Sequence, residues 1–177
     1  MIRAVIDTNV LRVAAKQHDD VSDECVETCV KYLLMMHNDG VVFIDDAYKI
    51  LGEYLKSPPL LKSNETGKKF LKWLLQNQSN PERVVQVAIT ETAIEWFAEF
   101  PDQALQARFD PPDRKFVAVA HAHPAKPPVW QAADCKWLDW WPALLAKGVR
   151  VEFLCPEDAC GFYRNKFPGK PLPALPD

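Results

Sequence analysis

Glycine is scarce in this chain, with six among 177 residues. Phosphate-binding loops of the Walker and Rossmann types need several glycines in a short span, because the backbone must approach the phosphates closely. Neither pattern occurs, so we expect no such loop. No apolar run approaches the roughly 20 residues that cross a bilayer, and Met1 is not followed by a basic and then apolar leader. The sequence therefore predicts a cytoplasmic protein without a membrane partner.

Positive charge is not in excess either. The net charge is −3 at pH 7, so the overall field does not attract nucleic acid, and such binding would require local basic patches. The number of cysteines is odd. Cys25 and Cys29 share the inward face of a predicted helix, which indicates packing, and Cys155 and Cys160 lack the spacing of a zinc site. A cytosolic compartment would keep them as thiols, so we predict reduced cysteines. These cysteines are Cys25, Cys29, Cys135, Cys155 and Cys160.

Apolar segments of two lengths alternate along the chain. Short apolar runs bounded by turn residues indicate buried strands, and longer segments with apolar residues every three or four positions indicate helices. The predicted strands are 2–7, 41–44, 84–89, 128–133 and 149–154. The predicted helices are 21–37, 45–56, 66–77, 90–97, 113–122 and 138–147, with a last turn or two within 156–166. This alternation predicts one domain over residues 1–166, a three-layer α/β/α fold with a mainly parallel central sheet, and a loose proline-rich tail over 167–177.

Four acidic residues lie at the ends of these segments: Asp7, Glu53, Asp113 and Asp134. Ligands of open α/β sheets bind beyond the carboxyl ends of the strands, and carboxylates gathered there repel one another unless a cation neutralises them. Oxygen-rich clusters suit Mg²⁺ or Mn²⁺. Each position also has a structural alternative. Asp7 and Asp113 fit helix caps, and Glu53 fits a solvated position at the flank of an apolar stripe.

The fourth acidic position has two candidates. Asp134 ends a predicted strand, which places its side chain in the same layer as that of Asp7. Asp139 precedes Trp140-Trp141-Pro142, and a proline fits an early helical turn. We predict that Asp134 faces the shared site and that Asp139 caps the next helix.

Together these positions resemble the motifs of the PIN-domain family of metal-dependent ribonucleases. Ile6–Leu11 is similar to the opening strand and loop of that family, and Asp46–Leu55 is similar to its second motif. Asp110–Ala120, in which an acidic residue precedes a basic pair and a phenylalanine, is similar to the third. The fourth motif usually holds two acidic residues close together. Here four residues separate Asp134 from Asp139, as a local insertion would produce.

The resemblance extends over residues 2–154 and implies a divalent-metal-dependent endoribonuclease that hydrolyses phosphodiester bonds of RNA with Mg²⁺ or Mn²⁺. The principal ligands would be Asp7 and Asp113, while the other acidic residues would ligate directly or orient bound waters. The implied catalytic residues are Asp7, Glu53, Asp113 and Asp134, and Asp139 is a further candidate metal ligand. The candidate substrate-binding residues are Thr8, Asn9, Arg12, Arg114 and Lys115, of which Thr8 and Asn9 fit helix capping equally well.

Two functional classes agree with these residues. The first is a ribonuclease, which in this family includes toxins held inactive by a small antitoxin protein. The second is a non-catalytic module with the same fold that binds RNA or assembles with another protein. RNA is the expected partner in both classes, an antitoxin or other protein is a second candidate, and a homodimer is a candidate assembly.

Overall fold

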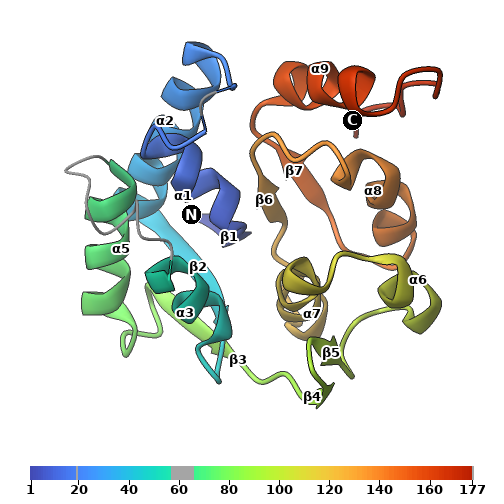
Figure 1. Ribbon diagram of the computed structural model, residues 1–177. Helices are drawn as coiled ribbons and strands as arrows, with labels where there is room; N and C mark the ends of the chain where they lie inside the picture. Colours follow the sequence, from blue (N-terminus) through green and yellow to red (C-terminus); the bar gives the residue numbers. More distant parts are fainter. Residues whose placement is uncertain (19, 57–65, 177) are drawn as a thin grey trace.

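The computed structural model describes residues 1–18, 20–56 and 66–176. Within these residues, five parallel strands form a sheet in the order β3-β2-β1-β6-β7 (Figure 1). The predicted α/β class and the parallel central sheet are confirmed. The strands are β1 (Ile2–Ile6), β2 (Gly40–Asp45), β3 (Val84–Val87), β6 (Val129–Gln131) and β7 (Val151–Phe153).

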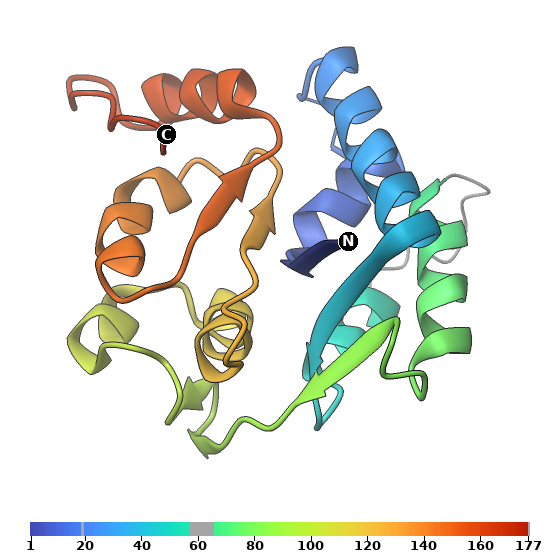
Figure 2. The same cartoon turned by 180° about the vertical axis from the view of Figure 1, so that it is seen from behind.

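Helices flank the sheet and complete a three-layer α/β/α arrangement. In both cartoon views α2 and α5 lie together on one side of the molecule, and α7 and α8 lie on the other (Figures 1 and 2). The first group of helices is α1 (Thr8–Ala14), α2 (Asp23–Asp39), α3 (Lys49–Lys56) and α5 (Thr66–Asn77). The remaining helices are α6 (Gln103–Arg108), α7 (Arg114–Ala122), α8 (Trp137–Ala146) and α9 (Pro156–Lys166), and the start of α9 lies beside the first turn of α2.

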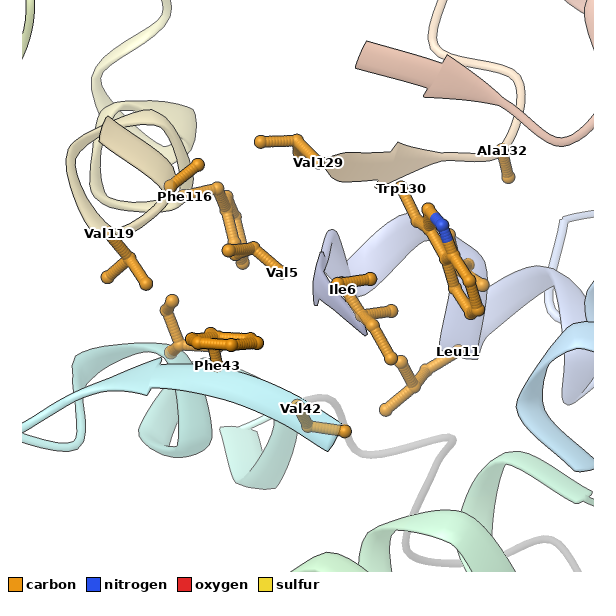
Figure 3. Close-up of a cluster of buried hydrophobic side chains, with 14 of the residues drawn as sticks. Val5, Ile6, Leu11, Val42, Phe43, Phe116, Val119, Val129, Trp130 and Ala132 are labelled. Carbon is orange, nitrogen blue, oxygen red and sulfur yellow. The ribbon is translucent and has the colours of Figure 1, made fainter. Parts of the chain in front are cut away.

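Both faces of the sheet are buried, which explains why its strands read as continuous apolar runs. Successive side chains of a strand point to opposite faces, so neighbouring residues serve different layers. On one face, Val5 and Phe43 meet Phe116 of α7 (Figure 3). On the other face, Ile6 and Trp130 lie toward α1 and pack with its Leu11 (Figure 3).

The segment 90–97 departs from its prediction. A helix is expected there, but the structure has a hairpin made of β4 (Glu91–Ala93) and β5 (Trp96–Phe97). Glu95 has a φ of 55°, a left-handed conformation that ends helical progression. The buried Gln106 side chain also bonds both the N–H and the carbonyl of Phe97. A contact with α6 therefore overrides the local helix signal.

The cysteines also depart from their prediction. Cys25 and Cys155 form a disulfide with a Cα–Cα distance of 5.2 Å, rather than two thiols. The pair is 130 residues apart, and it meets because the first turn of α2 lies beside the start of α9. Within the described part of the chain, Cys29, Cys135 and Cys160 are free and buried.

Two further features concern the ends of the fold and its surface. Residues 167–176 contain no helix or strand, and the Trp141 Nε1–H donates to the Ala174 carbonyl, at 2.9 Å. In the residues that the structure describes, no helix has the length and apolar character needed to cross a bilayer.

Candidate functional site

Asp7 directly follows β1 and starts α1. As the N-cap of that helix, its Oδ1 accepts a hydrogen bond from the Asn9 N–H at 2.8 Å, so the capping alternative is real. Its other oxygen, Oδ2, is buried and has no hydrogen-bond partner among the described residues. Burial, followed by the negative charges of Glu53 and Asp134, raises the pKa of Asp7 to about 7. Asp7 is therefore a cap that also presents an unpaired oxygen to its surroundings.

Glu53 comes to the same place from α3. The carboxylate of Asp45, at the end of β2, accepts from the N–H groups of Lys49 and Ile50 and so starts this helix. One turn later, Glu53 accepts a hydrogen bond from the Thr8 hydroxyl of α1. Glu53 also forms an ion pair with Lys115 of α7, whose side chain is only 7% exposed. A buried cation thus already compensates part of the negative charge here.

Asp113 ends a short 3-10 turn, Pro111–Asp113, at the start of α7. Two prolines before it fix the backbone for helix entry, and its side chain makes no capping hydrogen bond. Burial, followed by the charges of Asp7 and Asp134, raises the pKa of Asp113 to about 9. The negative charge of Asp134 therefore disfavours the ionisation of both Asp7 and Asp113. We call Asp7, Asp113 and Asp134, together with Glu53, the carboxylate cluster.

The two candidates for the fourth position lie in different surroundings. Asp134 follows β6, is half-buried, and raises the pKa of both Asp7 and Asp113. Asp139 is exposed, and its Oδ1 accepts a hydrogen bond from the Tyr163 hydroxyl of α9 at 2.7 Å. The prediction that Asp139 caps the helix is wrong, because α8 already begins at Trp137 and Asp139 lies inside its first turn.

Strand order brings the cluster together. β1 and β6 are parallel neighbours with Ile6 opposite Trp130, so their carboxyl ends meet at one edge of the sheet. Asp7 and Asp134 lie just beyond those ends, where ligands of open α/β sheets bind. Glu53 in the second turn of α3 and Asp113 at the end of the 3-10 turn before α7 supply the other two carboxylates.

The carboxylate cluster matches a divalent-cation site in its chemistry but not fully in its geometry. Hard carboxylate oxygens and a buried, unpartnered Asp7 Oδ2 suit Mg²⁺ or Mn²⁺. However, no three carboxylates of the cluster have oxygens that all lie within 4.8 Å of one another. Among the described residues, the one set of three or more His, Cys, Asp or Glu side chains that meets this distance is Cys25, Cys29 and Cys155. Coordination by all four would require Glu53 to exchange Lys115 for the ion.

Two clefts lie next to the cluster. The first, of about 310 Å³, is lined by Glu53 and Lys115 of the cluster region together with Lys49 and Lys56. The second, of about 480 Å³, is lined by Asn9 and Asp134 on one side. Its other walls include His18 and Phe162, whose rings stack with centroids 5.6 Å apart, and Lys166. Each cleft therefore combines part of the cluster with basic side chains.

Of the predicted substrate-contacting residues, some have side chains without a hydrogen-bond partner in the described part of the chain, and others bond to Glu53. Arg12 is exposed on α1, and the buried Oδ1 of Asn9 has no partner among the described residues. Thr8 and Lys115 instead bond to Glu53 inside the fold.

Arg114 lies inside the fold. It is buried, donates to the carbonyl groups of Phe109 and Glu95, and lies 4.5 Å from the centroid of the Trp96 ring. These bonds hold the β4–β5 hairpin against α7, so the guanidinium has a packing role in this structure. Its place beside Lys115 in a basic pair gave no sign of this burial.

Sequence reasoning missed a second ion pair near the cluster. Lys136, two residues after Asp134, pairs with Asp110, and this hydrogen bond raises the pKa of Lys136. The position of Asp110 near the cluster could have been predicted, because Asp110 opens the same segment that contains Asp113. The stacked pair His18 and Phe162 was missed as well, and no local pattern connects residues so far apart in the sequence.

Comparisons of the chain with protein-family models, with curated proteins and with solved structures find no match. The site's own geometry therefore carries the functional argument.

Proposed function

We propose that this protein is a divalent-metal-dependent endoribonuclease whose centre is the carboxylate cluster. The observation that carries the proposal is the pair of acids with raised pKa values, the buried Asp7 and the half-buried Asp113, gathered with Asp134 at the carboxyl edge of the sheet. Charges that repel one another in this way are costly unless a cation is bound, and perturbed carboxyl groups of this kind are concentrated at functional sites. The resemblance to PIN-domain motifs points to the same class.

The chain's own residues divide the work as follows. Asp7, Asp113 and Asp134 would hold Mg²⁺ or Mn²⁺, with Glu53 joining them on release from Lys115. When bound, the ion supplies a water of lowered pKa as nucleophile and stabilises negative charge on the phosphoryl oxygens. Thr8 orients the Glu53 carboxylate through its hydroxyl. Lys115, once released from Glu53, would contact a phosphate oxygen at the edge of the first cleft.

The two clefts favour a single-stranded substrate. The first offers several lysines for the phosphate backbone, and the second offers Lys166 together with the stacked rings of His18 and Phe162. Aromatic faces bind unpaired bases by stacking, which a duplex does not allow. RNA running from one cleft to the other would place a phosphodiester bond beside the carboxylate cluster.

One observation favours a second function, a non-catalytic module that binds RNA or assembles with another protein. The buried Lys115 already neutralises Glu53, so part of the negative charge is compensated without any metal. A protein of this second class would bind RNA through the same clefts and leave it intact.

The test is cleavage of labelled single-stranded RNA with Mn²⁺ or Mg²⁺, and with EDTA in their place. We expect metal-dependent cleavage, and we expect Asp7→Asn to lower the rate at least ~100-fold, because it removes a metal ligand but keeps the Oδ1 acceptor that caps α1. The matched control is Asp39→Asn, the same change at an exposed residue before β2, which should retain full activity.

Equal cleavage by wild type and Asp7→Asn would point to a contaminating nuclease and would count against the proposal. Binding of RNA by the wild type without cleavage under any of these conditions would favour the non-catalytic module.

A further inference from the structure

Three cysteines meet at a place separate from the carboxylate cluster. Cys25 lies in the first turn of α2, Cys29 follows one turn later on the same face, and Cys155 directly precedes α9. The Sγ atoms of Cys29 and Cys155 are 3.8 Å apart, and the sulfur atoms of all three lie within 4.8 Å of one another. A disulfide joins Cys25 to Cys155 and leaves Cys29 beside it as a free thiol.

The surroundings of these sulfurs are acidic. A cavity of about 130 Å³ reaches Cys25 and Cys155 from the surface, and Glu24, Glu157 and Asp158 are among its walls. Among the described residues, no lysine, arginine or histidine lines it. Asp158 is held in place, because its carboxylate accepts from the N–H and the hydroxyl of Ser22 at 2.7 and 2.9 Å. Such a cavity favours the approach of a cation.

We propose that Cys25, Cys29 and Cys155, when reduced, form a thiolate site for a soft divalent cation such as Zn²⁺, and that oxidation to the Cys25–Cys155 disulfide closes this site. Thiolate sulfur is the donor that such ions prefer, and a set of three protein ligands leaves one coordination position open. The cavity that reaches Cys25 and Cys155 would supply a water to that position. The same three sulfurs thus have two alternative states, a crosslink and a metal site.

The conversion between these states balances as follows. A dithiol reductant transfers two electrons and two protons to the disulfide, yielding the thiols of Cys25 and Cys155 and the oxidised reductant. Binding of one divalent cation by the three thiols then releases three protons to solvent, because each ligand coordinates as a thiolate. Reoxidation of the pair by a disulfide oxidant reverses the first step and removes two of the three ligands.

A crosslink alone does not explain the third sulfur. Cys29 Sγ lies 3.8 Å from Cys155 Sγ, yet it takes no part in the disulfide. The crosslink therefore uses two of the three sulfurs, whereas a cation uses all three together.

The experiment uses the full chain, reduced with a phosphine and freed of metal, and titrated with Co²⁺ as a spectroscopic probe. We expect the thiolate-to-cobalt charge-transfer absorption to saturate at one thiolate-bound Co²⁺ per chain, and we expect Zn²⁺ to displace this ion. Cys29→Ser and Cys155→Ser should each weaken binding at least ~100-fold, more than the loss of an outer-shell group does. The matched controls are Cys135→Ser and Cys160→Ser, which change buried cysteines outside the group of Cys25, Cys29 and Cys155 and should bind Co²⁺ as the wild type does.

Comparison of redox states tests the proposal without any substitution, should a variant fail to fold. Oxidised wild type should show no charge-transfer absorption, and reduction should restore it. The proposal is overturned if reduced wild type gives no such absorption, if Cys29→Ser binds as tightly as wild type, or if the control variants lose binding equally. Asp7→Asn should keep the full cobalt signal, which separates this site from the proposed catalytic centre.

Discussion

Lys115 is a charged side chain held inside the protein by the groups that it neutralises. It pairs with Glu53, and its positive charge opposes part of the rise in pKa that burial causes at Asp7 and Asp113. Because a buried cation is costly to desolvate, its presence indicates how strong the negative field of the carboxylate cluster is. A divalent ion at the cluster would compete with Lys115 for the same carboxylates.

Replacing Lys115 by methionine tests this compensation. We expect Lys115→Met to lower the free energy of unfolding in EDTA by about 2 to 3 kcal/mol, somewhat less than a fully buried pair would lose, because Glu53 is about a third exposed. Mn²⁺ should recover part of the loss. The matched control Lys56→Met, at an exposed position of the same cleft, should be near neutral in urea denaturation. Equal stability of the two variants would contradict the compensating role.

Asp113 gives a prediction about pH. Its pKa in the folded protein is about 9 and its ordinary value is 3.8, so the unfolded chain releases this proton first as pH rises. The folded protein therefore loses stability between about pH 4 and pH 9, and Asp113→Asn should remove this loss. In EDTA at pH 8 the variant should be more stable by at least about 1.4 kcal/mol, which corresponds to one pKa unit.

The gain from Asp113→Asn should vanish near pH 4, where the carboxyl group is protonated in both states. Denaturant titrations at pH 4, 6 and 8 measure it directly. A variant that is less stable than the wild type at pH 8 would show that folding does not raise the pKa of Asp113.

At the scale of elements, the disulfide joins parts of the chain that the sheet alone does not connect. Cys25 belongs to α2, which precedes β2, and Cys155 belongs to the junction of β7 and α9. The Ser22–Asp158 hydrogen bonds and the stack of His18 on Phe162 support the same junction. The last helix is thus held against the first half of the fold, where it forms one wall of the second cleft.

Reduction should weaken this junction measurably. Opening a crosslink between residues 130 apart should lower the free energy of unfolding by roughly 2 to 4 kcal/mol in EDTA, chiefly because the unfolded chain regains freedom. Guanidine denaturation with and without a phosphine measures the difference. The double variant Cys25→Ser with Cys155→Ser should be insensitive to the reductant, and an equal response of that variant would rule out the crosslink as the cause.

At the scale of the whole molecule, the net charge affects the binding of RNA. A net charge of −3 repels a polyanion on average, so binding must depend on local lysines and should fall as salt rises. The two clefts supply such lysines on either side of the carboxylate cluster. Their separation also sets the path that a bound strand would follow.

Charge reversal in the clefts tests this path. Lys56→Glu in the first cleft and Lys166→Glu in the second should each lower RNA affinity and reduce the slope of affinity against salt by about one ion. Lys72→Glu, at an exposed position of α5, is the matched control and should change both quantities little. Fluorescence anisotropy in EDTA and in Mg²⁺ measures them. Equal losses in all three variants would indicate a nonspecific charge effect.

Local patterns determined much of the architecture. The apolar runs around Val5, Val42 and Val129 lie in strands, and the segment 66–77 forms α5 as expected, because side-chain periodicity records which face of an element is buried. Acidic residues placed just after strands likewise pointed to the edge where Asp7 and Asp134 gather. Parallel strands bring their carboxyl ends to one edge whatever their distance in the sequence.

The tertiary structure alone decided which groups face each other. The ion pair of Glu53 with Lys115, the disulfide of Cys25 with Cys155, and the burial of Arg114 against the hairpin all join residues that no local pattern connects. Sequence periodicity indicates that a side chain points inward but not what it meets there. Charge compensation and crosslinking depend on distances of a few ångströms, and those distances exist only once the strand order and the helix packing are set.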